Sequence, residues 1–212
     1  MSSSEQGVPL HLDPALVDIP SLLRFRAPRS YTDPDFMRLK ASIAHLGGNV
    51  QPIKVRCGAE GRYELVLGSR RLRGCLELGL PVTAVVDNVS GPRVVEELDA
   101  SNDDSQVSVY ERGCLYEAAL NAGLFPSRRR LADALGRRLQ EVADVLTVAQ
   151  LPRQLLDRLP DPRVLKVSVA KRLAAAVARD PHGFDDRLSR AALNHSADLG
   201  FLIKELIRPP SA

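Results

Sequence analysis

Apolar positions divide the chain into two parts with different periodicity. Before about residue 105, alternating apolar and polar residues predict strands over 53–57 and 62–67, joined as a hairpin across 58–61, and a short buried strand over 81–86. Beyond that point only helical spacing occurs. The pattern predicts an α+β domain followed by an all-helical domain.

The α+β part also carries helix signals. Asp33 is a candidate N-cap, Pro34 occupies the first helical position, and Gly47-Gly48 ends the helix. Its apolar face is Phe36, Leu39, Ile43 and Leu46. A second helix is expected to begin with Ser69 as its cap, with Leu72, Leu76 and Leu78 on its apolar side. The remaining expectations are a disordered tail over 1–14, an extended edge segment over 17–25, a helix over 92–98 and a polar loop over 99–106.

The helical part begins with a capping-box spacing. Ser108 and Glu111 lie three residues apart at the start of a helix that is expected to run to Gly123. The helices expected after it cover 127–135, 139–149, 152–159, 168–179, 185–194 and 196–207.

The segment 128–147 has the spacing of a helix-turn-helix. Ala132 supplies the small residue that a close helix crossing requires, and Gly136 follows where the tight turn favours a positive φ. Val142 and Val145 are apolar positions of the second helix, and they share a core with Leu131 and Leu135. An ordinary helical hairpin remains the alternative.

In a helix-turn-helix, the second helix enters the major groove of DNA. Gln140 suits an adenine edge, and Arg138 suits guanine or phosphate. The arginines that open the preceding helix are better placed for phosphates. At least one of Glu141 and Asp144 is expected to pair with an arginine, because both carboxylates would repel the DNA backbone. The predicted DNA-binding residues are Ser127, Arg128, Arg129, Arg130, Arg137, Arg138, Gln140 and Asp144.

The charge distribution agrees with that interpretation. The 212 residues carry a net charge of +3, but residues 121–180 hold 12 basic against 6 acidic side chains. A basic block inside a near-neutral chain indicates a polyanionic partner. No apolar run approaches a membrane span and the start lacks a signal peptide, so we expect a soluble protein.

The cysteines and histidines do not suggest a metal centre. The three cysteines are widely spaced, and we expect buried thiols rather than a disulfide. The four histidines form no ligand spacing with one another or with the cysteines.

The stretch from Gly68 to Arg73 is a candidate anion site. It places a small-residue turn and three arginines between an alternating strand and an amphipathic helix. Backbone N–H groups, the helix dipole and guanidinium groups can then converge on one anion.

Together with Gly48–Arg56 upstream and the helix-turn-helix downstream, this order resembles the ParB family of partition proteins over roughly residues 15–160. The resemblance implies a ParB/sulfiredoxin-like N-terminal domain, nucleotide-binding over 15–105, and a helical DNA-binding domain over 106–212. It further implies that Gly48–Arg56 frames a cytosine base and that 68–73 holds phosphates, with Ser69 in place of the family's glutamate, as in plasmid-borne members. The implied ligand is CTP with Mg²⁺, and the implied nucleotide-binding residues are Gly48, Gln51, Pro52, Gly68, Ser69, Arg70, Arg71, Arg73 and Asn102.

The third family motif, Glu-Asn-x-x-Arg, is altered here to Ser101-Asn102-Asp103-Asp104-Ser105. Asn102 is kept and could serve Mg²⁺, but the glutamate and the arginine are lost. The sequence therefore predicts weak CTP binding and at most a weak CTPase, with no catalytic residue assigned. Residues 1–15 lack the basic side chains with which family members stimulate a ParA-type ATPase, so that partner stays open. No strand pattern for the family's C-terminal dimerisation domain is found.

Three functions remain at this stage. The first is a homodimeric protein of the bacterial cytoplasm, associated with nucleoid or plasmid. It would bind an inverted repeat of double-stranded DNA in partition or transcription, with CTP as a clamping switch. The second is a nucleotide-independent repressor or adaptor with a vestigial pocket. The third is a ParB-like nuclease or NTPase. Sulfiredoxin-type redox chemistry is disfavoured, since Ser69 stands where sulfiredoxin has its cysteine.

Overall fold

The computed structural model describes residues 8–24, 26, 28–103, 107–193 and 199–208. The chain separates into two compact units. One comprises Met1–Gln106 with Asn121–Leu124, and the other comprises Val107–Leu120 with Phe125–Ala212.

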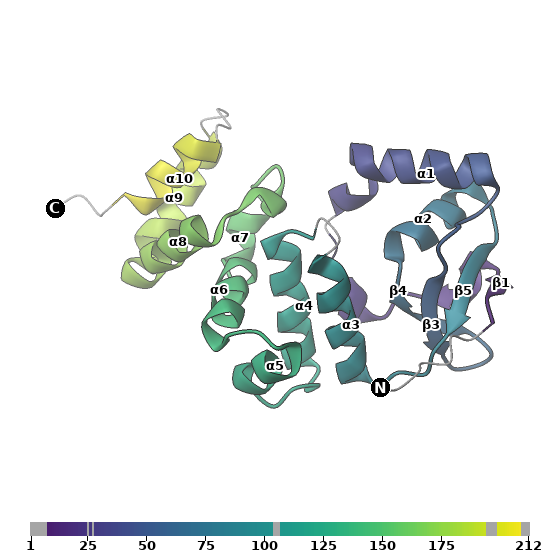
Figure 1. Cartoon of the computed structure of the whole chain (residues 1–212). Helices are drawn as coiled ribbons and strands as arrows, with labels where there is room; N and C mark the ends of the chain where they lie inside the picture. The colour runs from purple at the N-terminus through teal and green to yellow at the C-terminus, as the bar shows by residue number, and fades with distance from the viewer. Residues whose placement is uncertain (1–7, 25, 27, 104–106, 194–198, 209–212) are drawn as a thin grey trace. The chain divides into compact units, whose positions relative to one another are not determined.

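The first unit is built on a five-stranded mixed sheet in the order β1-β5-β3-β4-β2 (Figure 1). The predicted hairpin is confirmed, with β3 and β4 antiparallel, while β5 runs parallel to β3 and β2 runs parallel to β4. The strands are β1 (Leu10–Leu12), β2 (Val17–Asp18), β3 (Ile53–Cys57), β4 (Tyr63–Leu67) and β5 (Val82–Val86).

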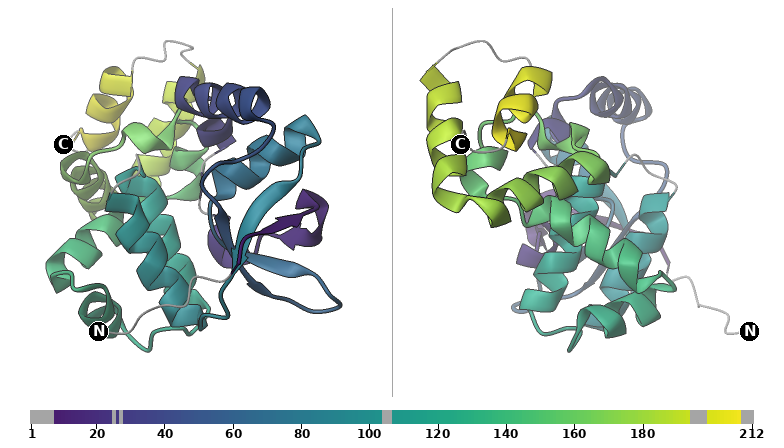
Figure 2. Two further views of the ribbon diagram at one scale, coloured as in Figure 1. Left: turned by 45° about the vertical axis from the view of Figure 1, so that its right-hand side comes forward. Right: turned by 90° about the vertical axis from the view of Figure 1, so that its left-hand side faces the viewer.

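Three α-helices cover this sheet: α1 (Pro34–Leu46), α2 (Ser69–Leu78) and α3 (Gly91–Asp103). The helix α2 packs on β3 and β5, α1 lies beside α2, and α3 packs against β4 (Figure 2). The predicted cap of α1 is confirmed, because Asp33 Oδ1 accepts a 2.8 Å hydrogen bond from the Phe36 N–H.

Several expectations for this unit are wrong. Residues 10–12 were expected in a disordered tail, but they form β1 and pair antiparallel with β5. The helix α3 continues through the expected loop to Asp103, with Asp99 buried. Residues Ser21–Leu23 form a 3₁₀ turn within the segment expected to be extended. The rest of the expected loop, 104–106, lies outside the described residues.

The buried face of α2 also differs from expectation. Leu72 and Cys75 are buried, whereas Leu76 is 48% exposed. Cys75 fits the expected buried thiol, Cys114 is half-buried, and Cys57 at the end of β3 is exposed. The buried face of α2 therefore contains Leu72 and Cys75 but not Leu76, a difference that the spacing of its leucines did not predict.

All regular secondary structure among the described residues of the second unit is helical. Its capping box is confirmed: Ser108 Oγ accepts from the Glu111 N–H at 3.2 Å, and Glu111 Oε2 accepts from the Ser108 N–H at 3.1 Å. The helices are α4 (Val109–Asn121), α5 (Arg128–Leu135), α6 (Leu139–Ala149), α7 (Arg153–Leu156), α8 (Val167–Arg179), α9 (Pro181–Leu193) and α10 (Leu199–Ile207). The predicted boundaries at 194 and 196 lie outside the described residues.

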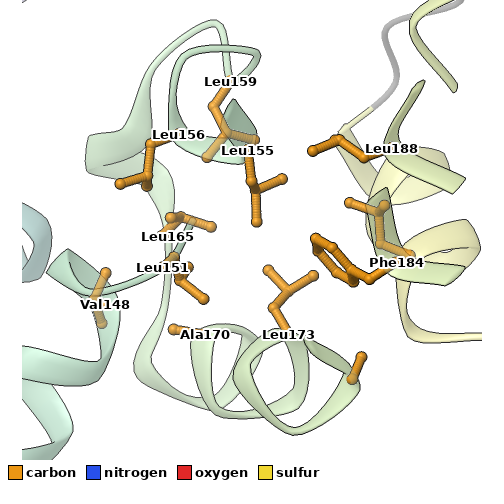
Figure 3. Packing of buried hydrophobic residues seen from close by; sticks show 12 residues of the cluster. Val148, Leu151, Leu155, Leu156, Leu159, Leu165, Ala170, Leu173, Phe184 and Leu188 are labelled. Atoms are coloured by element: carbon orange, nitrogen blue, oxygen red, sulfur yellow. The ribbon is translucent and has the colours of Figure 1, made fainter. Parts of the chain in front are cut away.

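A leucine-rich cluster forms the core between α7, α8, α9 and α10. Leu173 of α8 and Phe184 of α9 point toward each other at its centre (Figure 3). Val148 at the end of α6 belongs to the same cluster, so burial of apolar surface connects α6 to α8. No helix among the described residues has the length and hydrophobicity to cross a membrane.

Candidate nucleotide cavity and DNA-binding helices

The first unit contains a cavity of about 540 Å³. Such a volume is typical of small-molecule sites, which occupy about 300–1,000 Å³. Its lining comes from α1, the loop after it, β4, the start of α2 and the end of α3. The lining residues are Leu23, Arg26, Leu39, Ser42, Ile43, Leu46, Gly48, Asn49, Val50, Gln51, Leu65, Val66, Leu67, Gly68, Ser69, Arg70, Arg71, Leu98 and Ser101.

The charge of this lining favours an anion. Arg26, Arg70 and Arg71 contribute to it, and the described lining includes no carboxylate. Its apolar part, from α1 and β4, can cover a flat or hydrophobic group. The cavity therefore has both positive charge for an anionic group and apolar surface for the uncharged part of the same ligand.

Gly68 sets the start of α2 at this cavity. Its φ of +101° is in the left-handed region, and a Cβ there would lie 2.7 Å from Ile53 Cγ2, so both conformation and space demand glycine. Gly68, and not Ser69 as expected, is the N-cap, and no side chain caps the helix. The first N–H groups of α2 therefore keep their capacity to bind an anion.

Arg71 has protein partners at the edge of the cavity. Its Nη1 donates to the carbonyl oxygens of Gln51 at 2.9 Å and Pro52 at 2.6 Å. Burial lowers the pKa of Arg71. The side chain thus fixes the Gln51-Pro52 segment, which the family resemblance assigns to the base.

Arg70 and Arg73 pair with carboxylates rather than with the Gln51 and Pro52 carbonyls. Arg70 Nη2 bonds Asp33 Oδ1 at 2.6 Å and its guanidinium lies 5.8 Å from the centre of the Phe36 ring, which joins α2 to α1. Arg73 does not line the cavity and pairs with Glu77 at 2.6 Å. The structure therefore brings two of the three predicted arginines to the cavity.

Asn49 was not singled out in the sequence, yet it organises the loop after α1. Its side chain is buried; Oδ1 accepts from the Thr83 N–H at 2.8 Å, and Nδ2 donates to the carbonyls of Gln51 and Thr83 at 2.9 Å. A single polar residue beside two glycines gives no periodic signal for such a role. Of Asn102 only the helical backbone is described, while its neighbour Ser101 lines the cavity.

In the second unit, α5 and α6 adopt the predicted helix boundaries. Ser127 Oγ accepts from the Arg130 N–H at 3.2 Å, and Gly136 ends α5 with φ +62°. Leu131, Ala132 and Val142 are buried. Leu135 and Val145 occupy the same shared side, the first half-buried and the second 8% exposed.

Gly113 of α4 also shapes the packing around α6, and the sequence analysis did not single it out. A Cβ at this position would lie 2.6 Å from the Val145 carbonyl oxygen and 2.9 Å from Ala149 Cβ. The backbone of α4 therefore packs directly against α6. A third helix supports the pair α5–α6.

Most of the predicted DNA-binding side chains are exposed, and they lie at the start of α5 or at the start of α6. Arg138 is 89% exposed and its Nε is 3.6 Å from Glu141 Oε2, which meets the expectation that a carboxylate pairs with an arginine. Asp144 instead pairs with Lys171 of α8 at 2.7 Å. The exposed members of the predicted set are Ser127, Arg128, Arg129, Arg130, Arg138 and Gln140, and the half-buried ones are Arg137 and Asp144.

The described residues contain no group of three or more histidine, cysteine, aspartate or glutamate side chains placed to hold a metal ion. The described cavity lining offers a cation only hydroxyl, amide and backbone oxygens. Those are weaker partners for Mg²⁺ than a carboxylate.

An α+β domain with an arginine-lined cavity, followed by helices with helix-turn-helix spacing, is the arrangement that the resemblance to the ParB family implies. Residues 15–101 match the ParB N-terminal domain family, so this part of the first unit is similar to a ParB N-terminal domain. The Pnob8-like ParB-N domain has the same fold, with a TM-score of 0.50 and 14% identity over 95% of this chain and 98% of that one. The predicted resemblance and fold class are confirmed.

Several relatives of known sequence are nucleoid occlusion proteins. That of Geobacillus sp. is 25% identical over 134 residues, 62% of this chain and 47% of the relative. That of Lysinibacillus sphaericus is 24% identical over 181 residues, 84% of this chain and 58% of the relative. The chain spans about half the length of these relatives. Both alignments are longer than the 106 residues that precede Val107, so the similarity extends into the helical unit.

Proposed function

We propose that this chain is a sequence-specific DNA-binding protein of the ParB type, acting in DNA partition or regulation, with CTP as a switch for clamping. The observation that carries the DNA part is the geometry of α5 and α6. They form a buried crossing with a left-handed glycine turn, exposed arginines at 128–130 open α5, and the exposed Arg138 is the N-cap residue of α6. That is the construction with which a helix-turn-helix places its second helix in the major groove.

The distribution of side chains supports a division of labour. Arg128, Arg129 and Arg130 open α5 and are exposed, so they suit phosphates. Gln140, one residue into α6, suits an adenine edge, and Arg138 suits guanine or phosphate. The uncapped start of α6 adds N–H groups for a phosphate.

The nucleotide part rests on the cavity of the first unit. Arg70, Arg71 and the uncapped N-terminus of α2 would hold phosphates, with Gly48 and Gln51 beside the base. Because the described lining lacks a carboxylate for Mg²⁺, we expect weak CTP affinity and slow or absent hydrolysis. The proposed setting is a homodimer on an inverted repeat in a bacterial cytoplasm, with a ParA-type ATPase as a partner to be tested.

The DNA part is tested by titrating a duplex selected from a random library with wild-type protein and two variants. Gln140→Ala should cost about 1–3 kcal/mol on the selected duplex and relax base preference at one position. Arg129→Ala should lower the affinity for duplexes of every sequence alike and make that affinity less dependent on salt concentration. An unchanged ratio of selected to random binding in Gln140→Ala would show that α6 is not the recognition helix.

One observation favours a second function, a nucleotide-independent repressor or adaptor. Two of the cavity arginines already have protein acceptors, Arg70 with Asp33 and Arg71 with the Gln51 and Pro52 carbonyls. In that case the cavity is vestigial. Calorimetry with CTP and Mg²⁺ separates the two functions.

A further inference from the structure

Lys171, Asp144 and Gln140 form a connected group on the surface of the second unit. Lys171 Nζ lies 2.7 Å from Asp144 Oδ1, and Gln140 Nε2 donates to the same oxygen at 2.7 Å. Lys171 comes from α8, 24 residues beyond the predicted helix-turn-helix segment 128–147. The hydrogen bond from Lys171 is the main reason that the pKa of Asp144 is lowered, so its carboxylate is ionised at neutral pH.

An ionised carboxylate can only accept hydrogen bonds. The glutamine amide next to it must therefore direct its NH₂ group to Asp144, which leaves Gln140 Oε1 and the second N–H for other partners. This fixes one of the two orientations of the amide. An amide of fixed orientation presents donor and acceptor to DNA in one order only, and that order distinguishes base pairs in the major groove.

Asp144 alone would be a poor residue for this task. Its charge lies on a helix proposed to approach phosphates, and a free carboxylate would repel them. Lys171 offsets that charge and restrains the carboxylate that orients Gln140. The packing of α8 against α6 gives the ammonium group its place, because Val148 of α6 shares a core with Ala170 and Leu173 of α8.

We propose that Lys171 is a positioning residue that determines base specificity by holding Asp144, and through it the amide of Gln140, in one orientation. The inference rests on the proposed DNA-binding function. It assigns a role in sequence recognition to α8, which lies outside the helix-turn-helix.

The competing role for Lys171 is direct contact with a DNA phosphate. The two roles differ in a measurable way. Loss of a phosphate contact lowers the affinity for every duplex alike. Loss of amide orientation instead changes the ratio of affinities between duplexes that differ at one base pair.

The test uses the full chain, the duplex that wild type selects from a random library, and the single-base variants of that duplex. Lys171→Met keeps the length of the side chain and removes its charge. It should reduce the ratio of affinities between duplexes that differ at the Gln140-dependent base pair about fivefold or more. Lys171→Arg keeps the positive charge and should retain that ratio. Arg172→Met, the adjacent exposed cation on α8, is the matched control and should leave discrimination at that base pair unchanged.

Asp144→Ala removes the shared acceptor and should relax discrimination at the same base pair. The double variant with Lys171→Met should discriminate no worse than either single variant, because both changes break one connection. Circular dichroism melting of each variant checks that the helices persist.

Equal weakening of all duplexes in Lys171→Met, with unchanged discrimination, would overturn the inference and leave the proposed function standing. A wild-type chain that selects no duplex would overturn the proposed function and the inference with it.

Discussion

Arg71 and Arg73 lie two residues apart on α2 but have different surroundings. Arg71 lines the cavity and donates to the Gln51 and Pro52 carbonyls, while Arg73 lies away from the cavity against Glu77. The family resemblance assigns both to the phosphates. Of these two arginines only Arg71 lines the cavity, so we propose a role in holding phosphates or shaping the base site for Arg71 and not for Arg73.

We therefore predict that Arg71→Ala removes CTP binding and that Arg73→Ala does not. The first change takes away a charged donor and releases the Gln51-Pro52 segment; the second breaks a surface ion pair worth less than about 1 kcal/mol. Calorimetry with CTP and Mg²⁺, with ATP as the control ligand, measures both variants against wild type. Equal loss in the two variants would contradict the placement of Arg73. A null titration of wild type would favour the vestigial cavity.

Residue positions that depend on local sequence were predictable, and those that depend on distant partners were not. Gly68, Arg70 and Arg71 stood out because glycine and arginines at the start of a helix are a local signal. Asn49 did not, since its partner Thr83 lies 34 residues away in the sequence. Ser69 was misplaced as a cap because the left-handed turn at Gly68 moves the helix start by one residue.

At the scale of elements, the packing of α4 on α6 depends on Gly113. We predict that Gly113→Ala destabilises the second unit by about 1–2 kcal/mol. The methyl group would meet the Val145 carbonyl, and this overpacking exceeds the roughly 1 kcal/mol that alanine gains in helix propensity. Urea unfolding measures the change. Gly48→Ala is the matched control: no atom lies within 4 Å of its new Cβ, and its free energy of unfolding should stay within about 0.5 kcal/mol of wild type. A Gly113→Ala variant as stable as wild type would contradict the close helix crossing.

The elements differ in how far sequence determines them. The caps at Asp33 and Ser108 and the Gly136 turn bond within three or four residues, so their helices were predicted nearly to the residue. The strand Leu10–Leu12 is three residues long and forms by pairing with β5, which lies 70 to 74 residues further along the chain. The end of α3 was missed because its residues 99–103 are mostly polar, the composition of a loop.

For the whole molecule, we predict a homodimer on an inverted repeat. A single recognition helix contacts too few base pairs for a unique site, and two helices related by a twofold axis supply the remainder. Light scattering of the chain with the full selected duplex and with a half-site duplex measures the stoichiometry. Two chains on the full duplex and weak binding to the half-site are expected. One chain bound stably to a half-site, with no second step, would count against the dimer.

The division into an α+β and a helical part was predictable at this scale, because strand and helix periodicities leave different patterns along the chain. The arrangement of charge was predictable as well: the basic excess of residues 121–180 falls on the segment that includes α5, α6 and α8. The pairing of Lys171 with Asp144 was not, since it depends on how α8 packs against α6.

The most direct test of DNA recognition by α5 and α6 is amide hydrogen exchange of the full chain with and without the selected duplex. Exchange should slow most over residues 127–150, and the strands of the first unit should change little. Unchanged exchange over 127–150, together with protection in another part of the chain, would contradict the central proposal.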